Sequence, residues 1–181
     1  MKDDAIEVRV ERPADTAASR RVHVEAFPAN GAVEPAEAGL VDALRVGPAW
    51  IPDLSLVAVV EGAVVGHAIG SRGWVTTASE DELPVVAVGP VAVRPDSQGC
   101  GAGSALMRMM VERAESMDES LLALLGNPAY YERFGFRPSA DWDIEPPESR
   151  WGAFFQALPL AGWPPGMRGA FRYPAAFDGL D

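Results

Sequence analysis

The stretch from Val91 to Met117 reads V-A-V-R-P-D-S-Q-G-C-G-A-G-S-A-L-M-R-M-M-V-E-R-A-E-S-M. It begins inside a short apolar segment, Val85 to Val93, which predicts a strand that ends before Pro95, because proline cannot donate to a sheet ladder. From Ser104 onward, apolar residues recur at helical spacing. The stretch therefore predicts a strand, a glycine-rich turn and an amphipathic helix, whose expected buried face consists of Leu106, Met109, Met110, Arg113, Ala114 and Met117.

The turn between these two elements contains three alternating glycines, Gly99, Gly101 and Gly103. Glycine adopts backbone conformations closed to other residues and lets a ligand approach the main chain. The helix that follows begins with unpaired N–H groups and a partial positive charge. This arrangement predicts a diphosphate site, although a purely structural turn, which needs only one glycine, remains the alternative.

Two common nucleotide-binding motifs are excluded at this turn. A phosphate loop of the kinase type requires Lys and then Ser or Thr after its last glycine, whereas Ser104-Ala105 follows here. A dinucleotide-binding fold requires an acidic residue at the end of the next strand. That predicted strand, Leu121 to Leu125, is followed by Gly126-Asn127.

A third pattern fits the turn and its surroundings. Val-x-Val followed by Gln-x-x-Gly-x-Gly resembles the acyl-CoA signature of the GNAT superfamily of N-acyltransferases. A second segment, N-P-A-Y-Y-E-R-F-G-F at 127–136, is similar to the segment that closes the thioester site in that superfamily. Gly126-Asn127-Pro128 and the run F-R-Y-P-A-A-F at 171–177 resemble its YhbS-like branch.

The resemblance implies a GNAT-like acyl-CoA N-acyltransferase fold, of the α/β (α+β) class, with a largely antiparallel seven-stranded sheet flanked by helices. One domain would occupy 1–181, with an acyl-CoA core at about 54–136, while 137–181 completes the sheet and the acceptor side. The implied activity is direct transfer of an acetyl group from acetyl-CoA, as co-substrate, to a primary amine of a small molecule or peptide. A non-catalytic acyl-CoA-binding module, transfer of a longer acyl group and a hydroxyl acceptor remain alternatives.

The resemblance also implies a set of site residues. Tyr131, four residues before Gly135, matches the general acid that protonates the departing thiolate, and Tyr130 is the competing candidate. A backbone N–H near Val91 would polarise the acetyl carbonyl. Pro90 removes a ladder donor, which predicts a bulge or an opening of the central strand. The residues implied to bind the cofactor are Val91, Ala92, Val93, Gln98, Gly99, Cys100, Gly101, Ala102, Gly103, Ser104 and Asn127.

Several residues near this site carry open interpretations. Asn127 either caps the next helix or binds pantetheine. The loop has no charged side chain, so Arg94 or Arg108 is expected to help bind the diphosphate. Cys100 has no histidine nearby in the sequence to activate it, and we interpret it as a space-filling residue. His67 lies on an apolar strand and is interpreted as a core histidine.

The sequence identifies neither the general base nor the acceptor. The segment Val85 to Gly89 contains no glutamate, so a water relay or one of Glu25, Glu34 and Glu80 would have to take the ammonium proton. An acceptor pocket is expected between the N-terminal helices and the C-terminal region. The aromatic residues expected to line it are Trp142, Trp151, Phe154, Phe155 and Trp163.

Composition narrows the class of protein. The net charge of −11 argues against nucleic acid or an anionic membrane surface as the main partner. With 181 residues and 48% hydrophobic content, the chain is long enough for one compact core. No metal is expected, and no apolar run is long enough to cross a membrane. Met1 to Arg12 does not read as a secretory signal, and the single cysteine suits the cytoplasm; homodimerisation is left open.

The other expected elements follow from periodicity and from turn residues. They are a strand at Ala5–Val10, a helix capped by Asp15 or Thr16 that runs to Ala26, and a helix at Ala36–Val46. A hairpin follows at Leu54–Glu61 and Ala63–Ser71, joined to the central strand by a polar connection. After Phe136 the chain is expected to be irregular until a last strand at Ala170–Tyr173.

Overall fold

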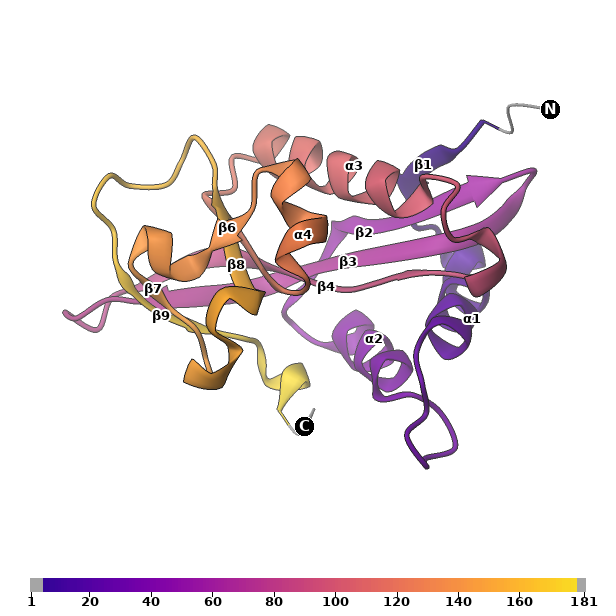
Figure 1. The fold of residues 1–181 in the computed structure, drawn as a ribbon, viewed down its shortest axis with the longest axis horizontal. Helices are drawn as coiled ribbons and strands as arrows, with labels where there is room; N and C mark the ends of the chain where they lie inside the picture. The colour runs from indigo at the N-terminus through magenta and orange to yellow at the C-terminus, as the bar shows by residue number, and fades with distance from the viewer. Residues whose placement is uncertain (1–4, 179–181) are drawn as a thin grey trace.

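A mixed β-sheet forms the centre of the computed structural model, which describes residues 5–178 (Figure 1). The sheet order is β1-β2-β3-β4-β5-β8-β6, and β9 pairs with both β3 and β7. Among the described strand pairs, only β4–β5 and β7–β9 are parallel. The strands are β1 (Glu7–Val10), β2 (Trp50–Val60), β3 (Ala63–Thr76), β4 (Glu82–Val93), β5 (Leu121–Leu125), β6 (Arg137–Pro138), β7 (Ile144–Glu145), β8 (Phe155–Pro159) and β9 (Gly169–Arg172).

Helices cover both faces of this sheet. Figure 1 shows α3 and α4 on one side and α1 and α2 on the other. The α-helices are α1 (Thr16–Ala26), α2 (Ala36–Val46), α3 (Ala102–Ser116) and α4 (Pro128–Tyr131). Short 3₁₀ segments lie at Pro13–Asp15, Pro95–Ser97, Glu132–Phe134, Ser139–Trp142, Ser149–Phe154 and Ala175–Phe177. The predicted fold class is confirmed: seven strands form the continuous sheet order, and β7 and β9 extend the sheet beside β3.

The N-terminal elements follow the periodicity closely. The hairpin of β2 and β3 turns at Glu61 (φ 48°) and Gly62 (φ 81°), and two left-handed residues are what a tight hairpin turn requires. Both strands are longer than predicted, and β4 begins at Glu82. Asp15 does not cap α1 with its side chain, because its carboxylate accepts hydrogen bonds from the Arg9 side chain and the Arg12 amide.

The buried face of α3 differs slightly from the predicted one. Met107 is fully buried together with Leu106, Met110 and Ala114. Arg113 instead reaches the rim, where its Nε donates to the carbonyl oxygen of Asp53 at 2.7 Å. Adjacent methionines make the apolar stripe of this helix wide enough for two alternative faces, so packing on the sheet decides which one is buried.

The region predicted to be irregular after Phe136 contains one substantial strand, so that expectation was wrong at β8. All five residues of β8 pair with β5, from Leu121 opposite Pro159 to Leu125 opposite Phe155. The sequence of β8, F-Q-A-L-P, shows little alternation because both of its faces are covered. Its partner strand, which lies far away in the sequence, is what makes it a strand.

The sheet opens between β4 and β5. The two strands pair only at Val86 with Leu122 and at Ala87 with Ala123, and beyond this point β4 has no partner on that side among residues 5–178. Gly89 (φ 137°) and Pro90 also form a bulge against β3, where the register shifts between Ala68 and Gly70. The bulge and opening predicted at Pro90 are therefore both present.

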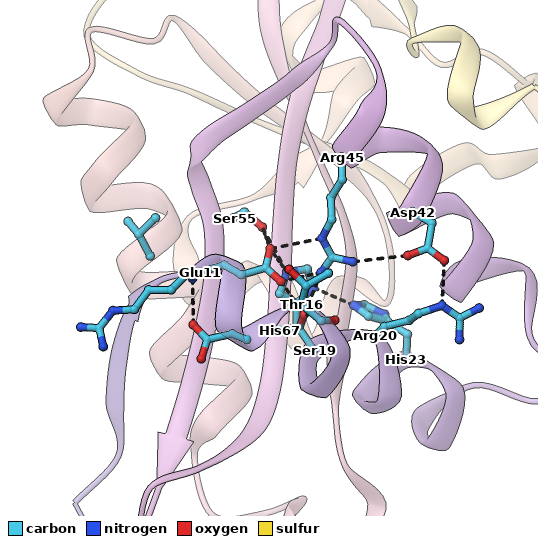
Figure 2. Close-up of polar contacts among 12 residues, drawn as sticks. Glu11, Thr16, Ser19, Arg20, His23, Asp42, Arg45, Ser55 and His67 are labelled. Carbon is cyan, nitrogen blue, oxygen red and sulfur yellow. Dashed lines mark hydrogen bonds and ion pairs between the residues drawn. The ribbon is translucent and has the colours of Figure 1, made fainter.

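A buried polar network joins α1 and α2 to the sheet (Figure 2). We call it the Glu11 network; its members are Glu11, Ser19, His23, Arg45, Ser55 and His67. The carboxylate of Glu11 accepts hydrogen bonds from Arg45 Nη2 at 2.5 Å and from the hydroxyls of Ser55, at 2.6 Å, and Ser19. Only 4% of its side chain is exposed, and Arg45 is 9% exposed. This ion pair is therefore held away from solvent.

The two histidines extend the Glu11 network between α1 and β3. His67 Nε2 lies 3.1 Å from Ser55 Oγ, and its Nδ1 lies 2.8 Å from His23 Nε2. Burial is the main cause that lowers the pKa of each ring, to about 2 for His23. Burial acts to raise the pKa of Glu11, but hydrogen bonds and charges, first from His67, outweigh it and hold that pKa well below its usual range. His67 is therefore a satisfied core histidine, as the sequence suggested.

Removing the arginine of the network should destabilise the fold. An Arg45→Met substitution leaves the Glu11 carboxylate buried without its cation, which typically costs about 3–5 kcal/mol. Urea denaturation would measure this loss. The control is Arg20→Met, since Arg20 pairs with Glu34 and Asp42 near the surface and its loss should have a much smaller effect. Equal effects of the two substitutions would contradict the assignment.

Stability should also fall as the pH is lowered from 7 to 5. The unfolded chain protonates His23 near pH 6.5, whereas the folded chain does not do so until about pH 2. The unfolded state therefore binds more protons, and the free energy of unfolding falls by about 2 kcal/mol for this ring. Thermal denaturation at pH 7, 6 and 5 would show it. A His23→Gln variant should respond less to pH, and an unchanged response would refute the explanation.

Candidate active site

The glycine-rich turn lines a cavity of about 450 Å³, which we call the loop cavity. One wall is the end of β4, and another is the turn with the start of α3. The segment around α4 supplies the third wall. The lining residues are Val91, Ala92, Val93, Ser97, Gln98, Gly99, Gly101, Ala102, Gly103, Ser104, Tyr130, Tyr131 and Arg133.

Two features of the turn explain its glycines. Gly99 (φ 80°) and Gly101 (φ 99°) adopt left-handed conformations, and Gly101 stands at the N-cap of α3. A Cβ at Gly103 would lie 2.7 Å from the Tyr130 hydroxyl, so glycine allows the tyrosine to approach the loop. The first turn of α3 presents amide groups that have no partner within the helix to whatever occupies the cavity.

The free edge of β4 supplies further donors. The amide of Arg94 donates to the carbonyl of Val65 at 2.8 Å across the β3–β4 pair. Because hydrogen bonding alternates along an antiparallel pair, the amides of Val91 and Val93 face away from β3, toward the opening. On the same edge, Gln98 Nε2 donates to the carbonyl of Val93 at 3.2 Å.

The two tyrosines cover the other side of the loop cavity. Their rings stand nearly perpendicular at a centroid distance of 4.9 Å. The ring of Tyr131 lies against Gly126, where a Cβ has no room. Burial, with a smaller contribution from Tyr130, raises the pKa of Tyr131 to about 12, so its phenol stays protonated at neutral pH.

The cation of this cavity is Arg133, which the sequence analysis missed. Its guanidinium lies 4.8 Å from the centre of the Tyr130 ring, and Arg133 is one of the lining residues. Arg94 is instead engaged by Glu25 at 3.1 Å and Asp96 at 2.8 Å, and Arg108 does not line the cavity. The signal was present, since Arg133 is the only basic residue in the 127–136 motif.

Two of the residues predicted to bind the cofactor do not line the cavity. Cys100 is exposed to solvent on the turn. Asn127 caps α4, because its Oδ1 accepts a hydrogen bond from the Ala129 amide at 3.0 Å. The structure thus shows the capping alternative for Asn127.

A second cavity, of about 720 Å³, adjoins the first along β4, and we call it the aromatic cavity. Val88, Gly89 and Pro90 line it, while Val91 to Val93 line the loop cavity, so consecutive residues of β4 line the two cavities where β4 separates from β5. Its remaining lining residues are Leu40, Thr76, Leu125, Pro147, Glu148, Trp151, Ala170, Phe171, Arg172, Tyr173, Phe177 and Asp178.

Only one of the five aromatic residues predicted for an acceptor pocket lines this cavity. Trp151 does, whereas Phe155 is fully buried and Phe154 is 56% exposed. Trp142 and Trp163 pack against the core beside β8. The sequence analysis missed three lining residues, Phe171, Tyr173 and Phe177. Phe171 belongs to β9, and Tyr173 follows that strand. All three lie in the run at 171–177, which the sequence analysis used only for the resemblance to the YhbS-like branch.

The predicted candidate bases lie elsewhere. Glu25 pairs with Arg94, Glu34 pairs with Arg20 at 2.6 Å, and Glu80 (φ 65°) sits in the connection between β3 and β4. The carboxylates that line the aromatic cavity are those of Glu148 and Asp178. Nothing in the sequence distinguished them, because their position depends on how the C-terminal region packs.

Residues 5–178 contain no group of three or more His, Cys, Asp or Glu side chains arranged to hold a metal ion. Within the same range, no helix is both long enough and apolar enough to cross a bilayer.

Comparison with known proteins bears on this geometry. The sequence model described as "Acetyltransferase (GNAT) family" matches residues 22–136, more than half of the chain. A curated relative, the uncharacterized N-acetyltransferase YjhQ of Escherichia coli strain K12, is 38% identical over 105 residues. That match covers 58% of this chain and 57% of YjhQ, so the similarity spans little more than half of the relative's length.

Two solved structures resemble almost the whole chain. A GNAT family acetyltransferase from Brucella melitensis in complex with acetyl-CoA is 33% identical, with a TM-score of 0.76, and the match covers 97% of this chain and 99% of that one. YhbS from Escherichia coli in complex with CoA is 27% identical, with a TM-score of 0.83, over 97% and 93% of the two chains. The family predicted from the sequence motifs is thereby confirmed.

Arg133 should contribute to binding a diphosphate ligand. We expect an Arg133→Gln variant to bind CoA, the ligand of the YhbS structure, roughly 10- to 100-fold more weakly, because a charge-assisted contact is worth roughly 1.5–3 kcal/mol. Calorimetric titration would measure it. Arg137→Gln is the matched control, since Arg137 lies on β6 and pairs with Asp141 at 2.9 Å. Unchanged CoA affinity in the Arg133 variant would exclude it from the site.

Proposed function

Since the chain belongs to the acetyltransferase (GNAT) family, we propose that it is an acetyl-CoA-dependent N-acetyltransferase. The observation that carries this proposal is that adjacent residues of β4, Pro90 and Val91, line two different cavities. One cavity offers backbone amides and a cation, which suits a diphosphate. The other is wide and largely apolar, which suits an acceptor. A primary amine of a small molecule or peptide is the proposed acceptor.

The cofactor is assigned to the loop cavity. The Brucella protein binds acetyl-CoA and YhbS binds CoA, and both resemble this chain over nearly its full length. The amides at the start of α3, with Arg133, would hold the diphosphate. The pantetheine arm would pair with the free edge of β4 at Val91 and Val93, which directs the thioester toward the aromatic cavity.

Acetyl transfer then needs few groups. The neutral amine attacks the carbonyl carbon, whose oxygen is polarised by the Val91 amide, and the new C–N bond replaces the C–S bond. Tyr131 gives its phenolic proton to the departing sulfur. The ammonium loses two protons in all, one before and one after the attack; one restores Tyr131 and the other is released to solvent.

The raised pKa of Tyr131 does not prevent this role. A phenol near pKa 12 is a weaker acid than an ordinary thiol near 8.5. The burial that raises the phenol's pKa also raises that of a thiol held beside it, because both anions lose hydration. The difference between the pKa of the phenol and that of the thiol is therefore smaller in the site than in water. The closeness of the Tyr131 hydroxyl to the sulfur would further support the proton transfer.

One observation favours a second candidate, a non-catalytic acyl-CoA-binding module. β4 carries no carboxylate between Val85 and Gly89, where a base would stand close to the thioester. Release of free thiol from acetyl-CoA in the presence of amines separates the two functions, since a pure binding protein releases none. Thermal stabilisation by acetyl-CoA or CoA, but not by NAD, would support the cofactor assignment in either case.

Replacing Tyr131 should affect turnover more than binding. We expect Tyr131→Phe to lower kcat by about 10²-fold or more, the usual contribution of a general acid, while acetyl-CoA affinity stays within twofold. Steady-state thiol release and calorimetry would provide the two values. Tyr130→Phe tests the competing tyrosine and should lose less activity. If it loses more, Tyr130 is the proton donor.

A further inference from the structure

We propose that the aromatic cavity selects a cationic amine with an aromatic body, and that Glu148 holds its ammonium group. This inference rests on the proposed N-acetyltransferase function and names the acceptor class. The residues that carry it lie beyond 136, outside the segment that matches the family model. The acceptor class is therefore a property of this chain's C-terminal region.

Four aromatic side chains form the walls of the cavity. The ring of Tyr173 stacks on that of Phe177 with a distance of 4.3 Å between ring centres, and it meets the Phe171 ring edge-on at 4.8 Å. The ring centre of Trp151 lies 6.2 Å from that of Tyr173. Burial raises the pKa of the Tyr173 phenol, so this wall stays neutral. Aromatic faces attract both aromatic rings and cations, and they offer little to a purely polar ligand.

The lining of the cavity carries two carboxylates and one guanidinium, so its formal charge is negative. Arg172 lines it, but its guanidinium pairs with Glu82 at 2.6 Å and lies over Trp74 at 4.4 Å. Glu148 and Asp178 are the carboxylates of the lining. An anionic acceptor would face both of them, whereas an ammonium gains from them.

Glu148 is the better placed of the two carboxylates. Its side chain is 42% exposed, and Asp178 is an exposed residue at the end of the described chain. Its carbonyl accepts a hydrogen bond from the Trp151 amide at 3.0 Å, so a single turn carries both the carboxylate and the indole. Its present partner is Arg150, whose side chain is 70% exposed, and such a surface pair is readily exchanged for a ligand cation.

The cavity also has room for more than an ammonium group. About 720 Å³ lies within the range of sites that bind drug-sized ligands. It reaches Gly89 and Pro90 beside the loop cavity. An arylalkylamine would place its ring against the aromatic walls and its nitrogen beside Glu148.

Calorimetric titration of the CoA-saturated protein tests this without turnover. We expect 2-phenylethylamine to bind at least tenfold more tightly than n-butylamine. The Glu148→Gln substitution should weaken the binding of 2-phenylethylamine about tenfold and leave the binding of the neutral analogue 2-phenylethanol unchanged. Glu145→Gln, on β7 and outside this cavity, is the matched control and should change neither. Phe177→Leu should weaken both aromatic probes.

Three results would overturn the inference. They are no saturable binding of 2-phenylethylamine, an affinity for n-butylamine equal to that for 2-phenylethylamine, or an equal loss of affinity for 2-phenylethylamine and 2-phenylethanol in the Glu148→Gln variant. The proposed function is judged separately, by stabilisation with acetyl-CoA and by thiol release with n-butylamine and spermidine. If those non-aromatic amines are acetylated while 2-phenylethylamine fails to bind, the proposed acetyltransferase function is supported and the aromatic acceptor class is refuted.

Discussion

The early end of the β4–β5 pairing is the constraint on which the site depends. After Ala87 the two strands have no further partners in each other, although β4 continues for six residues to Val93 and β5 continues to Leu125. Unpaired backbone groups on a strand edge must find other partners. A ligand that adds to this edge satisfies them, and the bulge at Gly89-Pro90 turns the strand at the same point. The opening thus provides both the space and the hydrogen bonds for a cofactor arm.

Different parts of the chain hold the two sides of this opening in place. The loop cavity is built from β4, α3 and the α4 segment, whose core packs Leu106, Met107 and Met110 against the sheet. On the other face, the Glu11 network holds α1 and α2 on β2 and β3. One member of the network, His67, is the cross-strand partner of Ala92 on β4, and Ala92 lines the loop cavity. Burying an ion pair costs desolvation free energy, but it favours one arrangement of the groups that it joins.

Recognition at the two cavities uses different physics. The overall charge of −11 does not favour an anionic cofactor, so its binding relies on locally oriented amides, the end of the α3 dipole and Arg133. The aromatic cavity instead combines neutral ring faces with carboxylates, which favours a cation. Its aromatic walls come from the C-terminal region, beyond the match to the family model, while β4 residues inside that match, Val88 to Pro90, line another side.

Local patterns alone determined the hairpin, α2, β5 and the turn–helix unit at Gly101, because hydrophobic period and glycine placement act over a few residues. They also indicated the family and the tyrosine pair. Only the tertiary structure made β8 a strand, chose Met107 over Arg113 for the core, and brought Arg133 to the loop cavity. It also gathered Glu148, Trp151 and Tyr173 around a space beside Pro90. Such groupings depend on contacts between distant segments, and no local periodicity encodes which distant side chains will face one another.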